Sequence, residues 1–341
     1  MLDIRSFGAV GDNSHDDTAA VQAAIDKAAE TGETIYVGPG EYLCDTLYMR
    51  PKVYIKSDPL WGFRRDELGR AIIRQRSDGI PCLLDLTECH GSTIDGLCLD
   101  GRGTGDTVGM LSRKPDYGKK EDAYRIENCK VSGFGSHAVF LDHIWCFSVR
   151  HCMFAFSGGH GLAINGWDGF ILDNWFSGNK GAGFASIGAN ASCTLTGNRI
   201  EWNRGGGIVI HDGSHYNITG NYIDRSGDAG IELVGARIVA ATGNVVYRSG
   251  KFRPDDREST QILLDGCKGV TFTGNSMNLG RDDGGKGDIT PSWGMRIKDL
   301  TDCAVIGNVM FNGGTVGTID DMGGHKNSVI DSNVGRAAAS N

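Results

Sequence analysis

The chain has 341 residues, a net charge of −8 at pH 7 and 52 glycines. An acidic chain without long runs of lysine or arginine excludes the electrostatic footprint of a nucleic-acid-binding protein, and no apolar stretch reaches the length of a transmembrane helix. The ten cysteines form no C-x-x-C pair and lie mostly inside apolar runs. We therefore expect buried thiols in a reducing compartment.

The chain begins Met-Leu-Asp-Ile-Arg, without the apolar core of a signal peptide. We expect a cytoplasmic protein, or a secreted one if a signal peptide has been removed. The first 45 residues predict a strand and turn, a short helix and a first coil. Asp16 and Asp17 offer an N-cap for a helix from Thr18 to about Glu30. This helix is expected to cap an open end of stacked strands, which would otherwise expose strand edges to aggregation.

From Ile126 to Asn308 one short phrase recurs: an apolar residue, then a polar residue or glycine, then asparagine. A steady period of this kind is typical of stacked repeats. Each repeat holds short runs of alternating apolar residues separated by glycine and asparagine, so it is built of strands and turns. The last residue of the phrase recurs every 23 to 33 residues, at Asn128, His151, Asn174, Asn198, Asn221, Asn244, Asn275 and Asn308.

These repeats predict coils of a parallel β-solenoid. Strands about 4.8 Å apart would place each residue on its counterpart in the next coil, so apolar side chains would form core columns. The asparagines would fall at a sharp turn, where asparagine tolerates the left-handed conformation and bonds to neighbouring backbone groups. Their predicted role is structural, as an internal hydrogen-bonded ladder.

The N-terminal region resembles the signature of the pectate-lyase-like superfamily of right-handed β-helices. The matching residues are Phe7-Gly8-Ala9-Val10-Gly11-Asp12, then Asp16-Asp17-Thr18-Ala19-Ala20-Val21-Gln22-Ala23-Ala24-Ile25-Asp26, then Val37-Gly38-Pro39-Gly40-Glu41-Tyr42. That superfamily includes polysaccharide lyases, alginate C5-epimerases, inulin fructotransferases, glycoside hydrolases and phage tailspikes. The resemblance implies a fold more than a reaction, because function depends on sites grafted onto the fold.

The predicted fold is therefore all-β: a single-stranded right-handed parallel β-helix with a short N-terminal capping helix. A solenoid grows by adding coils, so we expect one domain over residues 1–341. Within it, residues 1–45 would form the cap and first coil, residues 46–335 the coils and residues 336–341 a loose tail.

Two members of the superfamily also resemble the middle of the chain. Ser132-Gly133-Phe134-Gly135 with Leu141-Asp142-His143 is similar to the Tyr-Gly-x-Asp-Pro-His stretch of alginate epimerases, but Phe134 replaces the tyrosine and removes the phenol that an epimerase would use. Residues 149–167 are similar in rhythm to inulin fructotransferases, whose catalytic carboxylate positions are His151 and Ala163 here. If this second resemblance holds, it implies a homotrimer.

The main predicted site uses side chains that point outward after the glycines of each repeat. Glu232 and Asp265 would lie on successive coils two residues apart in register, with Cβ atoms roughly 7 Å apart. Carboxylates at such a distance serve as general acid and as base or nucleophile at a glycosidic bond. His211, one coil before, and Arg296 and Lys298, one coil after, would bind or polarise the substrate. The alternative is a salt-bridge ladder on a solvated sheet face.

Two insertions, residues 251–259 and 281–292, precede the strands that carry Asp265 and Arg296, so they are expected to wall a groove. They bring Asp282, Asp283 and Trp293 as substrate-binding candidates, with Trp293 stacking on a sugar or packing under its own loop. Asp282 with Asp283, or Asp255 with Asp256, could hold calcium, although no twelve-residue calcium loop is present. A second candidate site consists of Asp142, His143 and His160 with the loop of residues 106–120.

The leading hypothesis is a carbohydrate-active enzyme that breaks or rearranges glycosidic bonds of a polysaccharide or oligosaccharide, with Glu232, Asp265 and His211 as catalytic residues. A uronate polysaccharide lyase or C5-epimerase is the alternative, and a non-catalytic, tailspike-like glycan-binding module is the third hypothesis. The expected partner is the saccharide, without nucleic acid or membrane. No metal site or cofactor is expected, except Ca²⁺ if the protein is a lyase.

Overall fold

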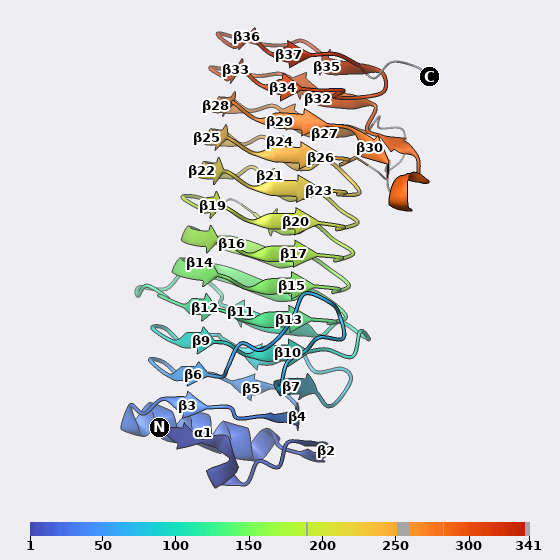
Figure 1. Cartoon of the computed structure of the whole chain (residues 1–341). Coiled ribbons are helices and arrows are strands. Elements are labelled where there is room, and N and C mark those ends of the chain that lie inside the picture. The colour runs from blue at the N-terminus through green and yellow to red at the C-terminus, as the bar shows by residue number, and fades with distance from the viewer. Residues whose placement is uncertain (189, 251–258, 282, 338–341) are drawn as a thin grey trace. The chain divides into compact units, whose positions relative to one another are not determined.

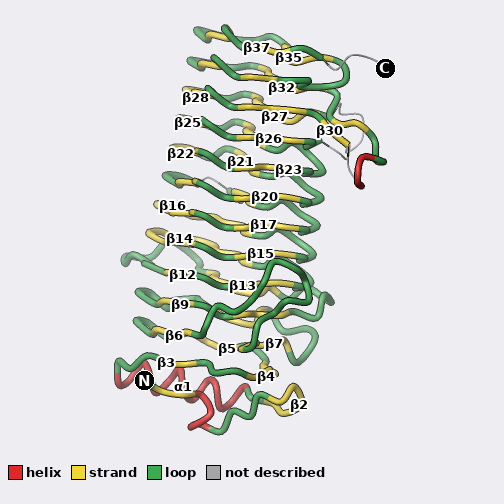
Figure 2. Tube along the Cα trace, viewed as in Figure 1, coloured by secondary structure: helices red, strands yellow, loops and turns green. Residues whose placement is uncertain are grey.

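The computed structural model describes residues 1–341 except 189, 251–258, 282 and 338–341 (Figure 1). Strands make up most of its regular structure (Figure 2), and apart from one short antiparallel pair the described strands pair in parallel, so the predicted all-β parallel helix is confirmed. The contacts divide the chain into two compact units, Met1–Trp175 and Phe176–Asn341. In the described part of the chain, no helix is long and apolar enough to cross a membrane.

The first unit begins with a short 3₁₀ turn, η1 (Ile4–Phe7), and the helix α1 (Thr18–Thr31). Helix α1 contacts the first strands of the unit, as expected of a cap, and buries Val21 and Ile25 against them. Its N-cap residue is Asp17, but the Asp17 carboxylate accepts hydrogen bonds from the backbone N–H groups of Val10 (2.6 Å) and Gly11 (3.1 Å) instead of capping the helix. Asp17 therefore ties the entering chain to the start of the helix.

The strands up to the boundary between the units, including the short N-terminal ones, pair in parallel. One sheet contains β8, β11, β14 and β16, and another contains β4, β7, β10, β13 and β15. The strands are β1 (Leu2–Asp3), β2 (Asp12–Asp16), β3 (Ile35–Tyr36), β4 (Gly40–Cys44), β5 (Leu47–Tyr48), β6 (Tyr54–Lys56), β7 (Ala71–Gln75), β8 (Cys82–Asp85), β9 (Thr93–Asp95), β10 (Cys98–Asp100), β11 (Val108–Arg113), β12 (Arg125–Glu127), β13 (Lys130–Ser132), β14 (Val139–Arg150), β15 (Met153–Ala155), β16 (Leu162–Leu172) and β17 (Trp175–Ser177).

The second unit repeats three strands per coil. Its first sheet contains β21, β24, β27, β32 and β35, its second β22, β25, β28, β33 and β36, and its third β20, β23, β26, β29, β34 and β37. The strands are β18 (Phe184–Ser186), β19 (Thr194–Thr196), β20 (Arg199–Glu201), β21 (Ile208–His211), β22 (Ser214–Thr219), β23 (Tyr222–Asp224), β24 (Ile231–Val234), β25 (Arg237–Thr242), β26 (Val245–Tyr247), β27 (Thr260–Asp265), β28 (Lys268–Thr273), β29 (Ser276–Asn278), β30 (Gly280–Arg281), β31 (Ile289–Thr290), β32 (Trp293–Lys298), β33 (Ala304–Ile306), β34 (Val309–Met310), β35 (Gly317–Asp321), β36 (Val329–Asp331) and β37 (Val334–Gly335), with the 3₁₀ turn η2 (Asp283–Gly285) between β30 and β31.

The core of the second unit consists of columns of like side chains. Ile210 pairs with Leu233, Leu233 with Leu264, and Leu264 with Ile297, and all four are fully buried. Stacking these branched side chains in register removes nearly all of their surface from water. Burial of apolar surface stabilises the folded state by about 25 cal/mol per Å². The strict alternation of these strands then leaves the intervening residues pointing outward.

The predicted asparagine ladder is present. In the second unit, the amide Nδ2 of Asn221 donates to Oδ1 of Asn244, and Nδ2 of Asn244 donates to Oδ1 of Asn275, both at 2.9 Å. In the second unit the left-handed residue of this turn is the glycine before the asparagine, such as Gly243 with φ +66°, whereas Asn128 of the first unit takes the left-handed angle itself, with φ +55°, as the sequence suggested. Glycine adopts the strained backbone angle at little cost, and the asparagine side chain forms the hydrogen bonds that buried backbone groups need.

Candidate active site

The main predicted cluster lies on the first sheet of the second unit. Val209 pairs with Glu232, and Val234 pairs with Asp265, so the two carboxylates fall on adjacent strands two positions apart. This is the predicted register. Nε2 of His211 lies 2.7 Å from Oε1 of Glu232; the Glu232 side chain is 13% exposed and that of His211 51%.

The cations that follow each have an acidic neighbour. Nζ of Lys298 lies 4.0 Å from Oδ1 of Asp265 and 3.6 Å from a carboxylate oxygen of Asp299. Nε of Arg296 donates to Oδ2 of Asp320 at 2.7 Å. The structure thus brings His211 to Glu232 and Lys298 to Asp265, but it gives Arg296 to a carboxylate outside the predicted set. A catalytic role for this cluster stays a prediction.

The insertion residues are only partly described. Trp293 pairs in register with Thr260 and Gly317, and a Cβ placed on Gly317 would lie 2.2 Å from the indole ring. The indole therefore packs over the glycine of the next strand. Asp283 begins the η2 turn, while Asp282, like Asp255 and Asp256, lies outside the described residues. Within the described part of the chain, no three His, Cys, Asp or Glu side chains gather as a metal site requires.

The second candidate site lies in the first unit, around an outward column of β11, β14 and β16. Arg113 pairs with Asp142, and Asp142 pairs with Asn165. Nδ2 of Asn165 donates to Oδ1 of Asp142 at 2.9 Å. Parallel in-register strands thus place the residues Arg113, Asp142 and Asn165 side by side on one surface.

A β-bulge adds an imidazole to this column. The register of β14 against β16 shifts between Asp142 and Ile144, and His143 there has a left-handed φ of +56°. The extra residue breaks the alternation that would otherwise send side chain 143 away from side chain 142. Nδ1 of His143 consequently lies 2.9 Å from Oδ1 of Asp142, close enough for an ion pair with a protonated imidazole but without the angles of a hydrogen bond.

A loop supplies a phenol to the same place. The hydroxyl of Tyr117, between β11 and β12, donates to Oδ1 of Asn165 at 3.1 Å. The Tyr117 ring meets the rings of Trp167 and His143 edge to face, with centroids 4.5 and 5.1 Å away. Phe134, which replaces the epimerase tyrosine in the sequence, is fully buried in the core. The phenol near Asp142 and His143 is therefore that of Tyr117 and not a residue at position 134.

A buried ion pair closes the base of this loop. Nζ of Lys114 lies 2.8 and 2.9 Å from the two carboxylate oxygens of Asp122, and these side chains are 4% and 2% exposed. Oδ2 of Asp122 also accepts from the backbone N–H of Trp145 at 2.9 Å, and the Trp145 indole N–H donates to the carbonyl of Tyr117 at 3.0 Å. These contacts fix both the ends and the tip of the Tyr117 loop on β14.

His160 joins a second imidazole beside this column. Its backbone N–H donates to Nδ1 of His137 at 2.9 Å, and the two rings stack with centroids 5.0 Å apart. Burial, with smaller contributions from His160 and Arg113, lowers the pKa of His137 to about 4, and burial also lowers the pKa of His160. The guanidinium of Arg113 lies over the ring of Phe140, 5.5 Å from its centroid. Two imidazoles that burial keeps neutral therefore lie near Phe140 and Arg113.

Two family models match the chain. The model described as right handed beta helix region matches residues 138–284 and 186–340. The model described as rhamnogalacturonase A/epimerase, pectate lyase-like, matches residues 1–55, which includes the N-terminal signature. Together the matches span residues 1–55 and 138–340 and so fall in both units.

Curated relatives include mannuronan C5-epimerases of Azotobacter vinelandii. AlgE5 is 28% identical over 245 residues, which are 62% of this chain and 23% of the relative. AlgE6 is 29% identical over 194 residues, which are 50% of this chain and 20% of the relative. The chain thus spans less than a quarter of the length of these relatives.

Solved structures show the same fold at low identity. The A-module of mannuronan C-5 epimerase AlgE6 of Azotobacter vinelandii matches with a TM-score of 0.66 and 17% identity over 98% of this chain and 99% of that one. Tailspike protein 2 of Escherichia coli O157:H7 bacteriophage CAB120 matches with a TM-score of 0.74 and 16% identity over 93% of this chain and 43% of that one. DFA-IIIase from Arthrobacter chlorophenolicus A6 matches with a TM-score of 0.72 and 13% identity over 96% of this chain and 92% of that one. From its coils, its cap and these matches, the chain belongs to the right-handed β-helix family and is pectate-lyase-like.

Proposed function

We propose that the protein is a carbohydrate-active enzyme that removes the C5 proton of a uronate residue in a polysaccharide. The observation that carries this proposal is the convergence of Tyr117, Asp142, His143 and Asn165 beside Arg113 in the first unit. The names of the curated relatives, mannuronan C5-epimerases, support the same class of reaction. The proposal favours this cluster over the Glu232 cluster as the catalytic centre.

The reaction needs a base, an acid and a cation. The C5–H bond lies next to the uronate carboxylate, so its electron pair can pass into that carboxylate when the proton leaves. Arg113, for which the described residues show no ion pair, would bind the carboxylate and stabilise the added charge. A bidentate guanidinium suits a planar carboxylate.

His143 and Tyr117 would move the protons. An imidazole takes up and releases protons near neutral pH, and Asp142 would orient His143 and stabilise its protonated form. Tyr117, oriented by Asn165, would then give a proton either to C5, which completes epimerisation, or to O4 as the C4–O4 bond breaks, which completes elimination. General acid and base groups of this kind contribute typically 10²- to 10⁴-fold.

The test uses mannuronan and polygalacturonate as substrates in D₂O. Epimerisation incorporates deuterium at C5 without chain cleavage, and elimination produces an unsaturated sugar that absorbs in the ultraviolet. Tyr117→Phe and His143→Gln should each lower turnover by about 10² or more. Tyr54→Phe, which removes an exposed hydroxyl bonded to Asp95, is the matched control and should retain activity. Full turnover by Tyr117→Phe would overturn the proposal.

A second candidate is cleavage of a glycosidic bond by Glu232 and Asp265. The 2.7 Å contact between His211 and Glu232, diagonal to Asp265, favours it. In that case Glu232→Gln and Asp265→Asn would abolish the release of new reducing ends from a glycan library, while Tyr117→Phe would leave it unchanged. Unchanged turnover in both carboxylate variants removes this candidate.

A further inference from the structure

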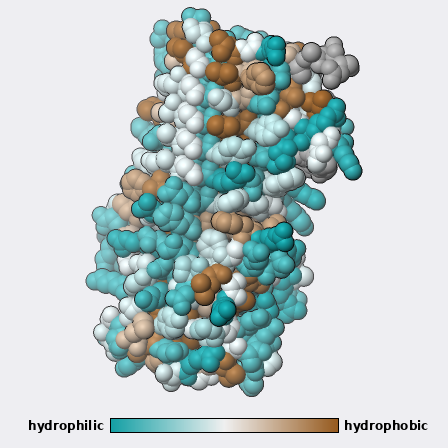
Figure 3. All heavy atoms as spheres, viewed as in Figure 1, coloured by the Kyte–Doolittle hydropathy of each residue, from teal (hydrophilic) through white to brown (hydrophobic). Residues whose placement is uncertain are grey.

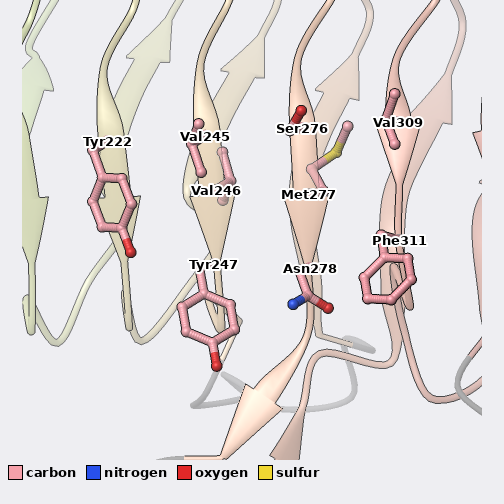
Figure 4. Close-up of a pocket in the computed structure, with 9 residues that line it drawn as sticks. All are labelled: Tyr222, Val245, Val246, Tyr247, Ser276, Met277, Asn278, Val309 and Phe311. Carbon is pink, nitrogen blue, oxygen red and sulfur yellow. The ribbon is translucent and has the colours of Figure 1, made fainter.

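The second unit carries a shallow cavity on the outward face of β23, β26, β29 and β34, far along the chain from Tyr117. Its volume is about 280 Å³, and we call it the sheet trough. Figure 4 shows the rings of Tyr222, Tyr247 and Phe311 beside one another on this face. The lining residues are Tyr222, Val245, Val246, Tyr247, Ser276, Met277, Asn278, Val309 and Phe311.

The trough exposes more apolar surface than a solvated sheet face needs. Val245, Ser276 and Val309 form one outward column in register, and Val245 and Val309 are 41% and 42% exposed. Phe311 beside them is 57% exposed. In Figure 3, apolar side chains gather among polar ones near the C-terminal coils on this side of the molecule. Contiguous exposed apolar surface of this kind marks a binding site.

Polar groups with directional chemistry border the apolar floor. Oδ1 of Asn278 is buried and accepts no hydrogen bond from the described residues. The guanidinium of Arg248 lies 4.1 Å from the centroid of the Tyr247 ring, but it already pairs with Asp224 at 2.9 Å. The guanidinium of the exposed Arg336, 5.7 Å from the centroid of Phe311, is a cation at the edge of the trough that a ligand can reach. An unpartnered amide oxygen in an apolar depression costs about 1–3 kcal/mol unless a ligand donates to it.

We propose that the sheet trough binds a stretch of acidic polysaccharide. Aromatic rings stack on the apolar faces of sugar rings, the Asn278 oxygen accepts from a sugar hydroxyl, and Arg336 pairs with a sugar carboxylate. A protein partner fits less well, because nine lining residues fall far below the 20 to 30 residues per side of a standard protein interface. Tyr247 and Phe311 lie two strands apart in the sheet, roughly 10 Å at the usual spacing, so an extended chain along the coils would contact both.

The proposed function enters this inference only in the choice of probe, since both concern acidic glycans. Affinity electrophoresis through gels containing mannuronan measures binding without any need for turnover. Tyr247→Ala and Phe311→Ala should each weaken retardation at least tenfold, and their double variant should keep only the retardation that the Tyr117 cluster of the first unit supports. Ile238→Ala, which removes an apolar side chain that is 56% exposed outside the trough, is the matched control and should bind like the natural protein.

Three further measurements decide the matter. Circular dichroism should show that the trough variants are folded, as expected for exposed positions. Retardation by mannuronan should fall with added salt and be absent with neutral dextran, because guanidinium–carboxylate pairing is screened; equal retardation by dextran would overturn the acidic class. Tyr117→Phe should keep full retardation, so loss of turnover and loss of binding are separable. Unchanged retardation in the Tyr247→Ala and Phe311→Ala double variant overturns the proposal.

Discussion

The buried Lys114–Asp122 ion pair provides a sharp test of how the Tyr117 loop is held. Both side chains are at most 4% exposed, and each would leave an unpaired charge in the interior if its partner were removed. Breaking such a pair by removing one partner costs about 3–5 kcal/mol. We expect Lys114→Met and Asp122→Asn each to lower the free energy of unfolding by about that amount. Replacing both residues, as Lys114→Met with Asp122→Leu, should recover most of the loss because no charge remains buried.

The double variant then separates stability from positioning. Asp122 also accepts from the backbone N–H of Trp145, so its loss loosens the loop even in a stable protein. A displacement of about 1 Å at a reacting group costs roughly 10²-fold in rate. We expect near-natural urea unfolding, followed by tryptophan fluorescence, together with a fall in kcat on a uronate polymer and little change in KM. Single variants that unfold within 1 kcal/mol of the natural protein would refute the reasoning.

The remaining predictions concern the scaffold. Asn244→Ala should destabilise the protein by about 3 kcal/mol or more in denaturant unfolding, because its buried amide makes four hydrogen bonds; the exposed Asn217→Ala should cost little. The pKa of His137 is lowered from 6.5 to about 4, so on acidification the unfolded chain binds the proton at a higher pH than the folded protein does. Thermal stability should therefore fall as the pH drops from 6.5 to 4. His137→Gln should flatten that fall, and an unchanged pH profile of the melting temperature would contradict the assignment. Iodoacetamide should modify Cys146 before the nine buried cysteines, such as Cys267, whose pKa burial raises to about 12; mass spectrometry of the native protein reads this out. Lys130→Met removes the donor to three carbonyls of residues 62–67, so limited trypsin digestion should cut there sooner than in the natural protein.

The register of the coils could be predicted from the sequence alone. Side chains alternate along a strand and stack between parallel strands, so one marker per repeat is enough to align every column. That is why Glu232 and Asp265 were predicted two positions apart on adjacent strands and are found there. The asparagine ladder follows from the same alignment, because a buried amide needs a partner and the next coil offers an identical one.

The alignment could not assign the left-handed residue of that turn. Asparagine and glycine both tolerate positive φ, and they are neighbours in the repeated phrase. The structure gives the strained angle to glycines such as Gly243 because the asparagine backbone N–H must point at the next amide oxygen. Glycine and asparagine have overlapping backbone preferences, so hydrogen bonding decides which of them takes the positive φ. The pattern of residue types alone does not show these hydrogen bonds.

The phenol of the candidate site was missed for a different reason. Aligning the repeats predicts which side chains stack on one another only within strands, and Tyr117 lies in a loop. The path of that loop depends on the contact between Lys114 and Asp122 and on the indole of Trp145. The sequence did contain a signal: a loop that carries an aromatic residue between a lysine and an aspartate, directly after the strand of Arg113. Charges of opposite sign at the two ends of a short loop can close it, and an aromatic residue at its tip then has to lie on the sheet beside it.

The bulge at His143 shows why the site is built where the repeat is irregular. In a regular strand, Asp142 and residue 143 would point to opposite faces, and no imidazole could approach the carboxylate. One extra residue reverses the alternation locally and puts both on the surface, at the cost of a left-handed non-glycine residue. The second unit keeps its register through β21, β24, β27 and β32, so Glu232 and Asp265 gain no such neighbour from their own strands. Left-handed non-glycine residues also occur in the second unit, for example His215 and Ile238, so the feature that distinguishes the column of Asp142 is the bulge, which brings an imidazole to its carboxylate.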